Sequence, residues 1–120
     1  MPFDQPNTVA DNLKVAKALI ADPDDWCQGT FHVASGERHR RCSYDALHVA
    51  VCGWDYEGDP RHIDKTRELK LLGEAAAHAM GFQSYCDMDV PAGAICVANN
   101  TLDHRGVMKM FDRAIQLAGG

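Results

Sequence analysis

Trp26-Cys27-Gln28-Gly29 and Cys42-Ser43-Tyr44-Asp45-Ala46-Leu47 delimit the stretch of sequence that decides the fold. Between these two motifs, residues 29–33 have β character because apolar residues alternate with polar ones, and Ser35-Gly36 is a turn signal. Residues 38–42 can then return as a second short strand, and the serine of the second motif can cap a helix. The stretch therefore predicts a short β-hairpin that leads into a helix.

Helical periodicity flanks this hairpin on both sides. Before it, Thr8 and Asp11 resemble a capping box ahead of apolar residues at helical spacing, and Pro23 ends that helix. Four further helices are predicted, starting at Ser43, Asp64, Pro91 and Asp103. We therefore expect one small globular domain over residues 1–120. Its predicted fold is mainly α (α+β), with about five helices around one core and the hairpin between helices 1 and 2.

Composition and charge narrow the class of protein. The chain is 46% hydrophobic and 24% charged, which is ordinary for a globular protein. No apolar run approaches the roughly 20 residues that cross a bilayer, so we expect no membrane partner. The net charge of −5 argues against nucleic acid as a partner, because such binding depends on Lys and Arg that neutralise phosphates.

The five cysteines predict a reducing compartment. Their number is odd, and they include no Cys-x-x-Cys pair. Residues 1–6 lack the basic start and the apolar stretch of a signal peptide. Because disulfides are rare in the cytosol, we expect free thiols and a cytoplasmic protein.

Three short motifs resemble those of a known family. They are Trp26-Cys27-x-Gly29, Cys42-x-x-x-Ala46-Leu47, and Asn99-Asn100 ahead of the last predicted helix. In these motifs the chain is similar to an uncharacterised family of small domains of unknown function from bacteria and bacteriophages. Members of that family show Trp-(Cys/Thr)-x-Gly, Cys-(Ala/x)-x-Gly-Ala-Leu and Trp-Asn-Asp. The chain departs from this pattern where Gly, Trp and Asp are replaced by Asp45, Ala98 and Asn100. The resemblance implies a cytosolic protein of bacterial or phage origin, and it implies no reaction.

Two cysteines and two histidines are candidate zinc ligands. If the hairpin forms, Cys27, His32, His39 and Cys42 can converge on one side of it and supply the four N and S ligands of a tetrahedral site. The spacing lacks the tight Cys-x-x-Cys or His-x-x-x-His pair of most structural zinc sites. The alternative interpretation is that the thiols are packed in the core, where free cysteines are common.

Cys42 is also a candidate nucleophile because it stands at the start of a predicted helix. The helix N-terminus and the nearby arginines predict a lowered thiol pKa, as in cysteine hydrolases, with Cys27 as a second candidate. A histidine with an Asn or Asp would complete such a site. The available residues are His78, His104 with Asp103, and Asn99. Equally, the motif is typical of the buried face of a helix.

The predicted hairpin carries a dense group of positive charges. Arg38, Arg40 and Arg41 flank His39. This group is either a phosphate-binding patch next to a helix N-terminus or a solvated arm of an acidic protein. The sequence alone leaves both interpretations open.

A second set of cations lies on the last predicted helix. Arg105, Lys109 and Arg113 recur at i, i+4 and i+8 and form a basic stripe away from the core face. The stripe is either the solvated side of the helix or a contact surface for an acidic partner or a second subunit. Trp54, in a predicted loop, is a further candidate contact because Trp is enriched at interface hot spots.

No sequence motif supports another enzyme class. The chain has no Gly-rich phosphate loop, His-Glu-x-x-His or Gly-x-Ser-x-Gly. We therefore expect a non-enzymatic accessory or interaction protein that needs no cofactor and binds a macromolecular partner. That partner is either another protein or a second copy of the chain in a homodimer. The alternatives are a zinc-stabilised domain and a cysteine-dependent hydrolase.

Overall fold

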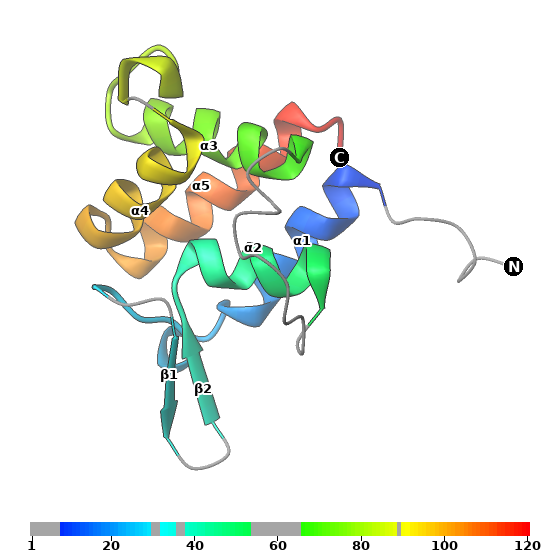
Figure 1. Cartoon of the computed structure of the whole chain (residues 1–120), viewed down its shortest axis with the longest axis vertical. Helices are drawn as coiled ribbons and strands as arrows, with labels where there is room; N and C mark the ends of the chain where they lie inside the picture. Colours follow the sequence, from blue (N-terminus) through cyan, green and yellow to red (C-terminus); the bar gives the residue numbers. More distant parts are fainter. Residues whose placement is uncertain (1–7, 30–31, 36–37, 54–65, 89) are drawn as a thin grey trace, which may run out of the picture.

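The computed structural model describes residues 8–29, 32–35, 38–53, 66–88 and 90–120. Its elements are, in chain order, α1 (Val9–Leu19), η2 (Pro23–Asp25), β1 (His32–Ser35), β2 (Arg38–Arg41), α2 (Ser43–Cys52), α3 (Arg67–Ala79), η4 (Tyr85–Met88), α4 (Pro91–Thr101) and α5 (His104–Leu117). The prediction of a mainly α fold with a hairpin between the first two helices is confirmed. The helices pack around one core, and β1 and β2 extend away from it (Figure 1). None of the described helices combines the length and the apolar character that a membrane crossing requires.

The amphipathic helix α5 supplies the centre of the core. Its apolar residues recur at i, i+3, i+4, i+7 and i+8, which places them on one face of the helix. The buried residues of this face are Val107, Met110, Phe111, Ala114 and Ile115. Phe111 is the largest fully buried side chain in the described structure, and α5 packs against both α1 and α3. Burial of this face therefore joins α1 and α3 through α5.

Three predicted helix starts are confirmed. Thr8 Oγ1 accepts a hydrogen bond from the Asp11 backbone at 3.1 Å, and the Asp11 carboxylate accepts one from the Thr8 backbone at 3.4 Å. This reciprocal pair is the predicted capping box of α1. Asp103 Oδ1 accepts from the Gly106 backbone at 2.7 Å and caps α5. Pro91 is the first residue of α4, where its missing N–H costs nothing.

Helix α3 begins later than the sequence indicated. Thr66 is its N-cap, and Thr66 Oγ1 accepts from the Leu69 backbone at 3.3 Å. The predicted cap Asp64 lies outside the described residues. At the other end, Gly81 follows the C-cap with a φ of +87°, a left-handed conformation that favours glycine. The predicted glycine stop is therefore confirmed.

The hairpin is joined to the helices at its base. Strands β1 and β2 pair antiparallel with His32 opposite Arg41. The second strand ends at Arg41, one residue earlier than predicted, because Cys42 is the N-cap of α2. The Cys27 backbone donates to the Arg41 carbonyl at 3.1 Å. The segment after η2 is thereby fixed to the start of α2.

Helices α3 and α4 approach closely at Gly73. A Cβ atom at this position would lie 2.6 Å from Pro91 Cβ and 2.8 Å from Pro91 Cα. The glycine therefore allows the first turn of α4 to rest directly on α3. Around this contact, the two helices bury Leu69, Leu72, Ala76, Ala94, Ile95 and Ala98.

Gly73→Ala is expected to lower the free energy of unfolding by about 1–3 kcal/mol, the usual cost of overpacking a core. At an unobstructed helix position the same change stabilises by roughly 1 kcal/mol, so the sign of the effect is diagnostic. Urea denaturation measures it, with Lys70→Ala on the exposed side of α3 as the control. A Gly73→Ala protein at least as stable as the wild type would contradict the close contact.

Candidate functional site

A buried amide, Asn99, connects three separate segments of the chain. Asn99 Oδ1 accepts hydrogen bonds from Trp26 Nε1 at 2.7 Å, from the Ser43 backbone at 2.9 Å and from Ser43 Oγ at 2.7 Å. Asn99 Nδ2 donates to the Cys27 carbonyl at 3.0 Å. The side chain is 1% exposed. These four residues form what we term the Asn99 junction.

The chemistry of the junction requires an amide at this position. The indole N–H and the backbone N–H are donors only, so they fix the side-chain oxygen of Asn99 on their side and leave the NH₂ group for Cys27. A carboxylate would accept the same donors but would repel the Cys27 carbonyl. A leucine would leave the donors of Trp26 and Ser43 buried without an acceptor, which is costly.

A second layer of hydrogen bonds attaches the first motif to the end of α4. Gln28 Nε2 donates to the Asn99 carbonyl at 3.1 Å and to the Leu102 carbonyl at 2.9 Å. The Gly29 backbone donates to Asn100 Oδ1 at 2.8 Å. The last carbonyls of a helix have no partner within the helix, so Gln28 acts here as a cap supplied from a distant part of the chain.

His104 links the junction to α1 and α5. Its Nε2 donates to the Ile20 carbonyl at 2.8 Å, at the end of α1. Its ring lies edge-on to Trp26, with the ring centroids 5.6 Å apart. Aromatic rings favour this geometry. His104, which was considered for a catalytic set, therefore has a structural position at the first residue of α5.

Ser43 does not cap α2 as predicted. Its backbone N–H and its hydroxyl both bind Asn99, so it is the first residue of the helix and not its cap. Cys42 takes the N-cap position, where its Sγ accepts from the Asp45 backbone at 3.4 Å. The requirement of the buried amide thus shifts the start of α2 by one residue.

The expected activation of Cys42 is wrong. Burial raises the pKa of the Cys42 thiol to about 12, although hydrogen bonds from the Asp45 and Tyr44 backbones act in the opposite direction. Burial, and next the Asp45 carboxylate, also raise the pKa of Cys27, while Arg40 lowers it by less. Desolvation exceeds the helix and arginine effects on which the sequence prediction relied. Both candidate nucleophiles are therefore thiols at neutral pH.

The four candidate zinc ligands have different positions in the structure. Cys42 is buried and its sulfur caps α2, while Cys27 and His39 are half-buried. The side chain of His32 lies outside the described part of the structure. No group of three or more His, Cys, Asp or Glu side chains that could hold a metal occurs among the described residues. The zinc site stays a prediction.

The arginines of the hairpin do not form one exposed patch. Arg41 is buried, with its Nε 3.2 Å from Asp45 Oδ2, so it does not belong to a solvent-facing phosphate site. Arg40 is exposed, and the side chain of Arg38 lies outside the described residues, as does Trp54. The ion pair from β2 to the first turn of α2 explains why Arg41 is directed inward.

An open groove of about 590 Å³ lies between α3 and α5. Its volume is in the range of sites that hold ligands, roughly 300–1,000 Å³. This α3–α5 groove is lined by Ala75, His78, Ala79, Leu102, Gly106, Lys109, Met110 and Arg113. Of the three residues of the basic stripe, Lys109 and Arg113 line the groove and Arg105 does not. The small and apolar lining residues, Ala75, Ala79, Leu102, Gly106 and Met110, form the floor of the groove. The sequence did not predict this floor because part of it comes from α3.

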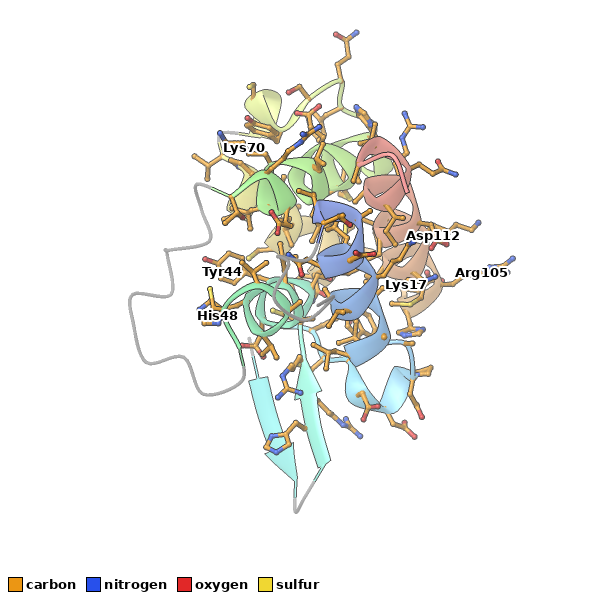
Figure 2. All side chains as sticks on the ribbon, turned by 90° about the vertical axis from the view of Figure 1, so that its right-hand side faces the viewer. Lys17, Tyr44, His48, Lys70, Arg105 and Asp112 are labelled. Atoms are coloured by element: carbon orange, nitrogen blue, oxygen red, sulfur yellow. The ribbon has the colours of Figure 1, made fainter. Side chains whose placement is uncertain are left out.

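Positive charge is concentrated around α5. Helices α1 and α5 hold five of the twelve lysines and arginines of the chain but only two of its seventeen aspartates and glutamates. On the α1 side of α5, Lys17 pairs with Asp112 at 2.7 Å, whereas Arg105 projects away from the molecule (Figure 2). Lys109 and Arg113 form no ion pair with any described residue. The two helices together therefore carry a net positive charge in an acidic protein.

The Asn99 junction brings together residues from all three sequence motifs. The model of a family of unknown function, DUF6197, matches residues 4–117. The chain belongs to this family. In this DUF6197 protein, Trp26 and Cys27 of the first motif, Ser43 within the second and Asn99 of the third meet at one buried amide. No curated protein and no solved structure matches the chain significantly.

Asn99→Leu is expected to lower the free energy of unfolding by about 3 kcal/mol or more, because it leaves several buried donors without an acceptor at roughly 1–3 kcal/mol each. Asn100→Ala is the matched control. It removes one exposed acceptor next to the junction and is expected to cost about 1 kcal/mol. Equal effects of the two substitutions in chemical denaturation would contradict the role of the buried amide.

Cys42 is expected to stay unlabelled by iodoacetamide in the native protein at neutral pH, while the exposed Cys86 reacts. Because the pKa of the Cys42 thiol is higher in the folded state than in the unfolded state, ionisation of this thiol opposes folding. The stability that the neutral thiol allows is therefore complete below the ordinary thiol pKa of 9.0 and is lost as the pH rises through about 12. Mass spectrometry of the labelled peptides measures both sites. Rapid labelling of Cys42 at neutral pH would show that the thiol is activated after all.

Proposed function

We propose that this DUF6197 protein is a non-enzymatic interaction protein that binds a protein partner in the α3–α5 groove. One observation carries the proposal: an open apolar surface adjoins two cations that form no ion pair with the described residues. Burial of apolar surface drives most protein association, and charges around it select the partner. The groove offers both.

The floor of the groove suits a protein side chain. Ala79 is exposed and Leu102 is half-buried, while Met110 packs in the core beneath them. A concave apolar surface of this kind accepts an anchor side chain from a partner, and such anchors contribute most of the binding energy in protein interfaces.

The state of the cysteines supports binding over cysteine-dependent hydrolysis. Burial raises the pKa of Cys42 to about 12, and the sulfur is occupied as a helix cap. Asn99, the amide that was considered for a catalytic set, uses both its oxygen and its nitrogen in the junction. An activated thiol with a free partner is the minimum for that chemistry.

We further propose that the protein acts in the cytoplasm of a bacterium or of a phage-infected cell. The cysteines are free thiols, as expected of a reducing compartment. The bacterial or phage origin rests on the resemblance of the three motifs. A partner in the same compartment is the natural occupant of the groove.

Ala79→Trp tests the proposal by filling the groove from an exposed position near the end of α3. The full-length protein, immobilised, is expected to capture one dominant partner from an extract of its source cells, and the variant to lose it. Val97→Trp is the matched control, because Val97 is 45% exposed on α4 and does not line the groove.

Two outcomes would count against the proposed function. Capture that Ala79→Trp leaves unchanged would place the interface elsewhere on the molecule. An extract from which neither the wild type nor Val97→Trp recovers a partner would remove the basis for an interaction protein. Sedimentation analysis of the wild type separates a homodimer from binding to a different protein.

A further inference from the structure

We infer that the occupant of the α3–α5 groove is an acidic amphipathic helix of the partner, an inference that rests on the proposed function. The shape of the groove is the first reason. Its lining residues on α5 run from Gly106 to Arg113, which is about 10 Å or two helical turns at 1.5 Å per residue. Leu102 extends the lining beyond the start of α5. A lining that covers two turns of α5 gives a partner helix room to lie along it.

The floor of the groove allows a helix backbone to approach. Ala75, Ala79 and Gly106 carry little or no side chain, so a partner helix can lie close to both α3 and α5. Leu102, which is half-buried, and Ala79, which is exposed, supply the accessible apolar surface above the buried Met110. A helix that lies in a groove presents apolar residues at i, i+3, i+4 and i+7, and the small and apolar residues of this floor leave space for such a row.

The charges of the groove select an acidic helix. Lys109 and Arg113 are one turn apart on α5, and no carboxylate is among the described residues that line the groove. Two carboxylates one turn apart on a partner helix would face these two cations. Arg105, the third cation of α5, adds to this positive potential, which attracts an acidic segment in an otherwise acidic protein.

A nucleic acid fits these features less well. Binding to nucleic acid depends on many phosphate contacts along a cationic track. Single strands additionally use exposed aromatic rings for stacking. Among the described residues, the lining has two cations and one histidine, with no other aromatic ring, next to an apolar floor. The chemistry of the groove therefore favours a protein helix.

The test uses two synthetic peptides of about 20 residues, above the roughly 12–15 residues at which isolated helices are marginal in water. Both carry Leu at i, i+3, i+4 and i+7; one carries Glu at two flanking positions one turn apart, and the other carries Gln there. NMR titration of the ¹⁵N-labelled full-length protein is expected to shift amides in 75–79 and 102–113. The Glu peptide is expected to bind about tenfold more tightly than the Gln peptide at low salt.

Substitution of the cations identifies the source of this selectivity. In the double variant Lys109→Gln and Arg113→Gln, both at exposed positions, the Glu and Gln peptides are expected to bind equally. Arg105→Gln, on the same stripe but outside the groove, is expected to keep the tenfold preference. Circular dichroism confirms that each variant retains its helices.

The outcomes separate this inference from the proposed function. Equal binding of both peptides by the wild type would overturn the acidic class, and binding of an oligothymidylate of about 12 nucleotides in place of either peptide would overturn the helix. If neither peptide binds while Ala79→Trp still abolishes capture of the natural partner, the inference fails and the proposed function stands. If Ala79→Trp changes nothing, the proposed function itself fails.

Discussion

Asn99 places a polar amide in the core, and a buried amide is stable only when its oxygen and its nitrogen both have partners. Here the partners come from segments 56 to 73 residues away in sequence. The amide therefore requires the first motif and the start of α2 to meet the end of α4 in one arrangement. In a low-dielectric interior these bonds are strong, and their loss is correspondingly costly.

The junction also fixes one end of the α3–α5 groove. Gln28 lies in the same segment as Trp26, and its side chain donates a hydrogen bond to the carbonyl of Leu102, which lines the groove. His104 packs edge-on against Trp26 and donates a hydrogen bond to the carbonyl of Ile20, the C-cap of α1. The turn between α4 and α5 is thus held on both sides. The junction of the three sequence motifs thus lies next to the proposed binding surface.

Much of the fold could be predicted because its signals are local. The capping box at Thr8, the first-turn Pro91, the Asp103 cap and the glycine stop at Gly81 each depend on a few neighbouring residues, and each is confirmed. The site was harder to predict because it depends on tertiary contacts. From the sequence, Asn99 is a residue of the third motif and a candidate companion of a nucleophile, and neither pattern predicts a buried amide that joins distant segments. The three motifs are far apart in the sequence, and only the fold shows that their residues meet at Asn99.

Burial explains the remaining differences between sequence and structure. The helix start and the arginines predicted an activated Cys42, but desolvation reverses the direction of the pKa shift. Arg41 belongs by sequence to a basic patch, yet it pairs with Asp45 inside the protein. The basic stripe of α5 was visible in the sequence. The apolar floor next to Lys109 and Arg113 was not visible in the sequence, because α3 and α5 come together only in the folded chain.

The central claim is that the buried amide of Asn99 holds Trp26 and Ser43 in place. Hydrogen exchange of the Trp26 indole N–H, followed by NMR in the native protein and assigned against a Trp54→Phe variant, tests it most directly. We expect this proton, which Asn99 accepts at 2.7 Å between the donor and acceptor atoms, to exchange as slowly as the backbone amides of the α5 core. Exchange at the rate of exposed surface groups would contradict the account.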